Sequence, residues 1–126
     1  MATTIKNYPE HHQELQGFMK QFARANPTVM KAFGQLHKAG SEEAVLSTKT
    51  KELIALGIAV AVRCDGCIAF HIADALKAGA SEKEITEALG VAVLMGGGPA
   101  AIYSAQAFEA LHQFQANPKM WAVGDD

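Results

Sequence analysis

Residues 52–71 read E-L-I-A-L-G-I-A-V-A-V-R-C-D-G-C-I-A-F-H and contain both cysteines of the chain, Cys64 and Cys67. His71 follows the second cysteine by four positions, and Glu52 precedes the first by twelve. Almost every residue between the glutamate and the first cysteine is apolar. A helix that is apolar on all sides is enclosed by other helices or by another subunit. The stretch therefore predicts a buried redox site, with the rest of the chain as its housing.

The composition predicts a single globular domain over residues 1–126, with residues 117–126 as a candidate loose tail. Of the 126 residues, 49% are apolar and 19% are charged, which suits a chain with a core of its own. The net charge is −2 and the basic residues are scattered singly, which argues against nucleic acid or anionic lipid as partner.

The location that we expect is cytoplasmic. The N-terminus lacks the apolar segment of a secretory signal, and the longest apolar run, residues 53–62, is about half of the ~20 residues that a membrane span needs. Two cysteines in that compartment indicate redox or metal chemistry rather than a structural staple.

Helix-forming residues dominate and no segment alternates apolar and polar residues over strand length, which predicts an all-α fold of about six helices. Caps and breaks place these helices at residues 10–25, 28–38, 49–62, 65–78, 82–95 and 100–115. Ser81 and Glu84 form a capping box, and the G-G-G-P run at 96–99 breaks the chain before the last helix. The apolar positions of the first two helices, among them Phe18, Phe22 and Phe33, are predicted to be core.

The cysteines lie at the expected N-terminus of the fourth helix, where unpaired N–H groups and the helix dipole favour a thiolate. His71 is one turn beyond Cys67 on the same helix face, within reach as a proton acceptor. The spacing of Cys64 and Cys67 lets the two sulfurs close a small disulfide with little backbone movement. If the third and fourth helices form a hairpin, Glu52 faces roughly residue 74, close enough to orient the His71 imidazole.

Other interpretations of the motif stay open at this point. The C-x-x-C spacing could be incidental on a helix, and Cys64, Cys67, His71 and Glu52 could together supply four zinc ligands. A thioredoxin-type site expects a βαβ context that this sequence lacks.

Other polar residues are given less weight. His11, His12 and Glu14 are interpreted as a solvated helix face, and His37 and His112 have no recognisable partner pattern. The glycine run lacks the lysine and hydroxyl residue of a phosphate-binding loop.

Glu52, the C-D-G-C motif at 64–67 and His71, at these gaps, resemble the active-site signature of the AhpD-like alkylhydroperoxidases of the carboxymuconolactone decarboxylase superfamily. The similarity extends from about Lys49 to Leu111. It includes the K-A-G-A-S-E-K-E-I-T-E-A turn and the G-G-G-P-A-A-I-Y-S-A-Q-A-F-E-A-L segment. Four matched positions with fixed gaps are far more specific than C-x-x-C alone.

The resemblance implies an all-helical fold, a homotrimer or homohexamer, and a thiol peroxidase that needs no metal, haem or flavin. It implies that Cys67 attacks the hydroperoxide and that Cys64 supplies a proton and resolves the sulfenic acid. His71 and Glu52 would form the proton relay, and a lipoylated or thioredoxin-like dithiol protein would restore the thiols. The best-known members carry a second histidine where this chain has Gly66, which implies a shorter relay and slower peroxide reduction.

Two further functions remain as alternatives. One is a disulfide oxidoreductase that exchanges electrons with a protein partner and barely reacts with peroxide. The other is a non-catalytic helical oligomer whose cysteines sense redox state or hold zinc.

Overall fold

The computed structural model describes residues 6–122, and within them it contains five α-helices, one short 3₁₀ helix and no strand. The all-α prediction is therefore confirmed. The elements are α1 (Tyr8–Ala25), α2 (Pro27–Ser41), α3 (Thr48–Ala61), α4 (Asp65–Lys77), α5 (Glu82–Ala116) and η1 (Pro118–Met120).

Side-chain caps begin these helices close to where the sequence predicts. Asn26 accepts the Val29 N–H at the start of α2, and Ser47 accepts the Thr50 N–H at the start of α3. Ser81 and Glu84 form the predicted capping box, each side chain bonding the other's backbone N–H. These side chains satisfy N–H groups that have no partner within the helix, so each cap fixes a boundary.

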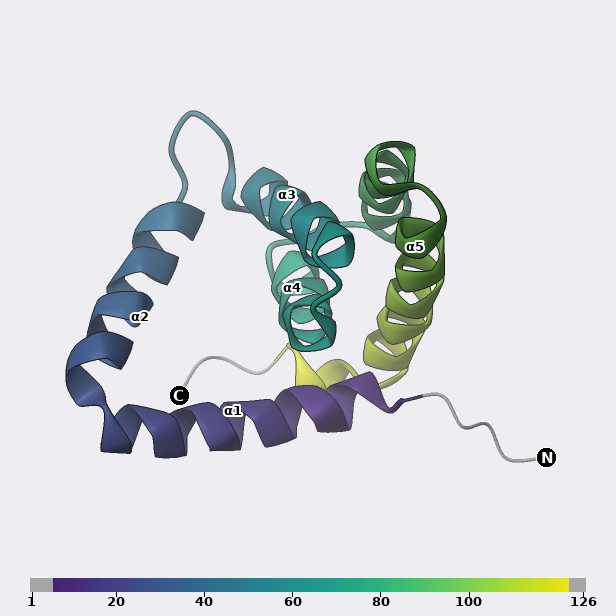
Figure 1. Ribbon diagram of the computed structural model, residues 1–126. Coiled ribbons are helices and arrows are strands. Elements are labelled where there is room, and N and C mark those ends of the chain that lie inside the picture. The colour runs from purple at the N-terminus through teal and green to yellow at the C-terminus, as the bar shows by residue number, and fades with distance from the viewer. Residues whose placement is uncertain (1–5, 123–126) are drawn as a thin grey trace.

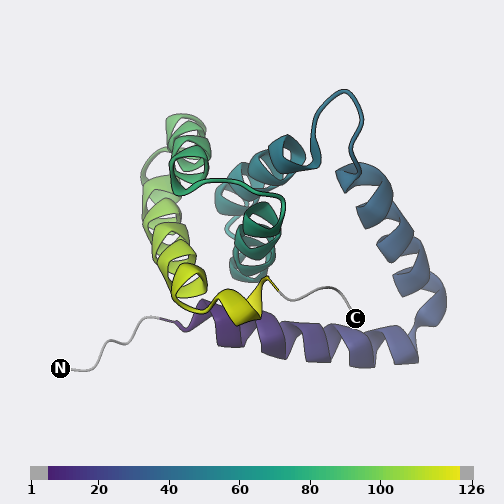
Figure 2. The ribbon, with the colours of Figure 1, turned by 180° about the vertical axis from the view of Figure 1, so that it is seen from behind.

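The element α5 comprises the last two predicted helices, which follow each other without a gap and are separated by a break within the glycine run, as the sequence predicts. The break lies at Gly97, whose φ of 67° and ψ of −146° are not helical and suit only glycine. Helical geometry resumes around Pro99, and the second segment of α5 runs back alongside the first (Figures 1 and 2). The Ser104 hydroxyl donates to the Leu89 carbonyl at 3.4 Å, and His112 Nε2 lies 3.7 Å from Glu82. By length and composition α5 is the one described helix that could cross a membrane, yet its buried residues serve the core.

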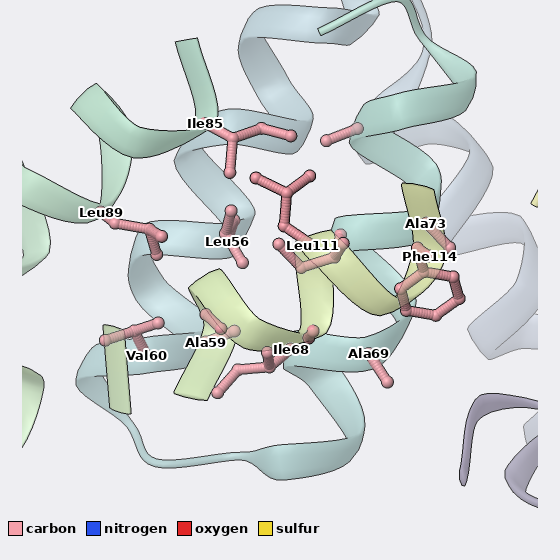
Figure 3. Close-up of a cluster of buried hydrophobic side chains, with 14 of the residues drawn as sticks. Leu56, Ala59, Val60, Ile68, Ala69, Ala73, Ile85, Leu89, Leu111 and Phe114 are labelled. Atoms are coloured by element: carbon pink, nitrogen blue, oxygen red, sulfur yellow. The ribbon is translucent and has the colours of Figure 1, made fainter. Parts of the chain in front are cut away.

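The core forms where α3, α4 and α5 meet (Figure 3). We call these three helices the body. Their fully buried large side chains are Leu56 and Val60 of α3, Ile68 and Ile72 of α4, and Ile85, Leu111 and Phe114 of α5. Small residues such as Ala69 and Ala73 lie between them, which lets the helices approach closely. The body thus holds α3 and α4 as the antiparallel pair that the site requires.

Residues 16–41, which we call the arm, stand largely away from the body and approach it at His37 (Figures 1 and 2). Phe18, Phe22 and Phe33 are each about half exposed, at 59%, 54% and 47%. The prediction that these apolar positions are core is wrong within a single chain. Their spacing gives each helix an apolar face, but the sequence pattern carries no information about what that face meets.

The C-terminal segment packs against the body as far as the structure describes it. Met120 and Trp121 contact the core, and the Trp121 indole N–H donates to the Phe114 carbonyl at 2.8 Å. Residues 123–126 of the candidate loose tail lie outside the described residues.

Candidate redox site

The two cysteines form a disulfide at the first turn of α4, with their Cα atoms 5.1 Å apart. Cys64 is the N-cap, and its sulfur accepts the Cys67 N–H at 3.1 Å. Arg63 just before it has a positive φ of 60°, which few non-glycine residues adopt, and this turns the chain sharply from α3 into α4. Negative charge on either sulfur would therefore face unpaired N–H groups at the positive end of the helix dipole.

Glu52 and His71 are brought together as the hairpin argument predicts. The Nδ1 atom of His71 lies 2.7 Å from Oε1 of Glu52, whose residue is only 4% exposed. A carboxylate accepts, so Nδ1 carries the hydrogen and Nε2 remains available to receive a proton. Since His71 lies one turn beyond Cys67 on α4, the pair forms a base and its orienting group next to the thiol position.

The start of α1 is tied to the C-x-x-C turn through Asp65, a contact that sequence reasoning missed. The Tyr8 hydroxyl donates to Asp65 at 3.1 Å, and Lys6 forms an ion pair with the same carboxylate. Burial raises the pKa of Tyr8, and the charge of Asp65 raises it further. Burial alone would raise the pKa of Asp65, but the hydrogen bonds from Lys6 and Tyr8 outweigh it and lower that pKa.

The glycine of the motif lies against α1. A Cβ atom built at Gly66 would be 2.8 Å from Cδ1 of Leu15, so any side chain here requires Leu15 to move. In this chain an aliphatic side chain from α1 therefore covers the place of the additional histidine that the resemblance implies. The sequence showed the missing histidine, but only the structure shows what fills the space.

Asp74 and His37 join the Glu52 side of the site, and neither was predicted. The ligand atoms of His37, Glu52 and Asp74 all lie within 4.8 Å of one another, although the residues come from three helices. Burial raises the pKa of Asp74, and the charge of Glu52 raises it further. The signal was present, because the hairpin geometry already placed residue 74 opposite Glu52.

Metal binding at these groups is limited by the partners they already have. A disulfide offers no thiolate, so zinc on Cys64 and Cys67 requires the reduced protein. The His37, Glu52 and Asp74 cluster has a spacing that a cation could bridge, but Glu52 already accepts from His71.

The surroundings that the sequence predicts for the other histidines are only partly those that the structure shows. His12 is not on a solvated face: it is 6% exposed and packs edge-on against Phe70 and Phe114. Burial lowers its pKa, because the charged imidazole would lose its water. His112 lies 3.7 Å from Glu82 at the surface, away from the cysteines.

The fold and the site define a helical domain that carries a C-x-x-C disulfide at a helix N-terminus beside a histidine–glutamate pair. The chain belongs to the carboxymuconolactone decarboxylase family, whose model matches residues 27–110. It is 39% identical over 92 residues to an uncharacterised protein of Cupriavidus necator, covering 71% of this chain and 81% of that one. It is also 33% identical over 91 residues, 72% of this chain and 82% of the relative, to an uncharacterised protein of the Paracoccus denitrificans cox locus.

Solved structures of the same family share the fold. The apo form of a carboxymuconolactone decarboxylase family protein from Legionella pneumophila superposes with a TM-score of 0.82 at 39% identity, covering 86% of this chain and 98% of that one. A family protein from Thermotoga maritima, for which an involvement in the antioxidative response has been suggested, superposes with a TM-score of 0.68 at 34% identity. The match covers 73% of this chain and 95% of that one. The match to AhpD-like proteins expected from the motif is thus confirmed at the level of fold and family.

Proposed function

We propose that this protein is a thiol peroxidase that reduces alkyl hydroperoxides through a cycle between the Cys64 and Cys67 thiols and their disulfide. One observation carries the proposal: the His71–Glu52 pair lies one turn from Cys67, while the disulfide spans the first turn of the same helix. The suggested antioxidative role of the Thermotoga maritima protein supports the same class of activity.

The cycle balances without a cofactor. His71 accepts the Cys67 proton at Nε2, and the thiolate attacks the outer oxygen of the hydroperoxide. The O–O bond breaks, Cys67 becomes a sulfenic acid, and the alcohol leaves with a proton from Cys64 or the imidazolium. Cys64 then attacks the Cys67 sulfur, water leaves, and the disulfide forms. A dithiol donor protein, lipoylated or thioredoxin-like, then reduces the disulfide by thiol–disulfide exchange. We place this cycle in the cytoplasm.

The test mixes reduced protein with a slight excess of tert-butyl hydroperoxide and follows both cysteines by mass spectrometry. We expect the disulfide to form rapidly in the unchanged protein and a sulfenic acid on Cys67 to accumulate in Cys64→Ser. Cys67→Ser should lose the reaction. We expect Glu52→Gln, which keeps the shape of the side chain, to slow it by roughly 10²–10⁴, the usual contribution of general acid–base catalysis. Full peroxidase activity in Cys67→Ser would refute the assignment of roles.

A second candidate, a protein disulfide oxidoreductase, is favoured by the surroundings of Gly66. The side chain that fills this position is the aliphatic Leu15 rather than a titratable group, so proton supply beside Cys67 depends on His71 and Cys64, without a second histidine. Thiols that stay reduced with peroxide, yet oxidise promptly with a protein disulfide, would favour this alternative. Stoichiometric zinc lost on Cys64→Ser would instead favour a non-catalytic zinc-holding oligomer.

We also propose that the protein acts as a homo-oligomer, a homotrimer or homohexamer. Two apolar surfaces support this: the arm, and an apolar groove of about 390 Å³ between α3 and α5. Ile54 and Ile58 border the groove and are 50% and 57% exposed. Contiguous apolar surface of this kind marks interaction sites.

The assembly is tested by Phe33→Glu, with Lys31→Glu on the same helix as the charge control. Removing one buried phenylalanine costs roughly 1.5–3 kcal/mol, or about a tenfold to hundredfold weaker association. Sedimentation should show smaller species for Phe33→Glu and the unchanged assembly for Lys31→Glu, with helicity retained in both. A wild-type protein that sediments as a monomer would refute the proposal.

A further inference from the structure

The histidine–glutamate pair does not stand alone, because a second carboxylate lies on the same side of it. Asp74 is three residues beyond His71 on α4, so the two side chains share a helix face. Its carboxylate also lies within 4.8 Å of the ligand atoms of Glu52 and His37. Four titratable side chains from three helices, the His71–Glu52 pair among them, therefore lie close together.

The members of this cluster differ in burial, from the exposed His37 to the buried Glu52. Glu52 is 4% exposed and Asp74 is partly buried, so two acids that could both be negative lie close together, and only Asp74 is reached by water. Like charges at this distance repel, and each is tolerated only if a proton or a positive group is shared among them. The groups that face Asp74 are His37 of α2, Glu52 of α3, and His71 and Lys77 of α4.

The shared positive group is best supplied by His71. Its Nδ1 atom is already held by Glu52, and protonation of Nε2 would add a positive charge that interacts with both carboxylates, one helical turn beyond Cys67. Carboxylates close to an imidazole favour its protonated form, and an imidazolium beside a cysteine in turn favours the thiolate. His37 is the exposed member of the cluster.

We propose that Asp74 is a positioning residue of the redox site, a second carboxylate that acts with Glu52 to favour protonation of His71 and thereby the thiolate of Cys67. The inference rests on the proposed function for its consequence, since the thiolate matters only if Cys67 reacts. The electrostatic part stands without it, because it concerns the imidazole of His71 in either redox state.

The first experiment follows the His71 imidazole by NMR titration in the disulfide form, in which no thiol titrates. Asp74→Asn should move the His71 titration to lower pH, on the order of one pH unit, because it removes a negative charge that favours the imidazolium. Asp74→Glu should restore most of the shift. Glu87→Gln, which removes an exposed carboxylate on α5, is the matched control and should leave the titration unchanged.

The second experiment measures how fast iodoacetamide alkylates Cys67 in reduced Cys64→Ser protein, with and without Asp74→Asn. The Asp74 variant should react several-fold more slowly near neutral pH, and the Asp74→Glu variant should recover. A His71 titration that does not move in Asp74→Asn would overturn the proposal. Stoichiometric zinc that is lost in both Asp74→Asn and His37→Gln would also overturn it, by making the cluster a metal site.

The two ideas fail separately. If the unchanged protein ignores tert-butyl hydroperoxide while the His71 titration still depends on Asp74, the peroxidase assignment fails and the role of Asp74 stands. If peroxide is reduced at the same rate and the His71 titration is the same in Asp74→Asn, the role of Asp74 fails and the peroxidase assignment stands.

Discussion

The body and the arm are built from helices of the same kind, yet their apolar residues have opposite surroundings. In the body, Leu56 and Ile72 are completely buried between helices of the same chain. In the arm, Leu36 and Phe22 recur at equally regular spacing and are 67% and 54% exposed. The comparison teaches that periodicity specifies which face of a helix is apolar, whereas the fold alone specifies what covers it.

The largest effect separates the two regions directly. Leu56→Ala removes a fully buried side chain and should lower the free energy of unfolding by about 2–5 kcal/mol, because it leaves a cavity in the body. Leu36→Ala makes the same chemical change in the arm and should cost far less in dilute protein. Urea unfolding followed by circular dichroism measures both. Equal losses would mean that the arm is as much part of the core as α3.

The fold was largely predictable from the sequence because its boundaries are set by local chemistry. The caps at Asn26, Ser47 and Ser81 all form the hydrogen bonds that their residue types predict. The prediction failed where the outcome depends on distant parts of the chain. In the arm, apolar side chains such as Leu36 and Phe22 stay largely uncovered by residues 6–122, whereas the break that the glycine run predicts is present at Gly97.

The site was predictable only as far as its residues share one hairpin. Glu52 and His71 meet because α3 and α4 are antiparallel neighbours whose register follows from the turn at Arg63. Tyr8 and His37 come from α1 and α2, and no local pattern indicates where those helices cross the body. The sequence therefore shows the cysteine pair and the histidine–glutamate pair but not the groups from α1 and α2 that lie beside them.

An intermediate effect is expected from the helix caps, and it again distinguishes the regions. Ser81→Ala removes the capping box at the start of α5 and should cost about 1 kcal/mol of unfolding free energy. Asn26→Ala removes the cap of α2, where local fraying leaves the body intact, so the global unfolding should change by only a few tenths. Thermal and urea unfolding of the two variants at equal concentration give the comparison. A larger loss in Asn26→Ala would show that the arm unfolds together with the body.

The smallest effect is expected where the body and the arm meet, at the titratable groups His37, Glu52 and Asp74. The pKa of Asp74 is raised by burial and by Glu52, so the folded state holds this proton more tightly than the unfolded chain does. Its contribution to stability is therefore fully present below the unfolded pKa of 3.8 and is lost as pH rises through the raised value.

Asp74→Asn, which keeps a neutral polar group at every pH, should accordingly unfold at slightly higher urea than the unchanged protein near neutral pH, with the difference shrinking as the pH approaches 3.8. The gain should be smaller than that of a fully buried charge, because water reaches Asp74 and weakens its interactions. Urea midpoints from pH 4 to pH 8, at about half-unit steps, measure it. A variant that is less stable at neutral pH would contradict the argument. A gain in stability together with slower alkylation of Cys67 would show that Asp74 is kept at a cost to the fold because the site requires its charge.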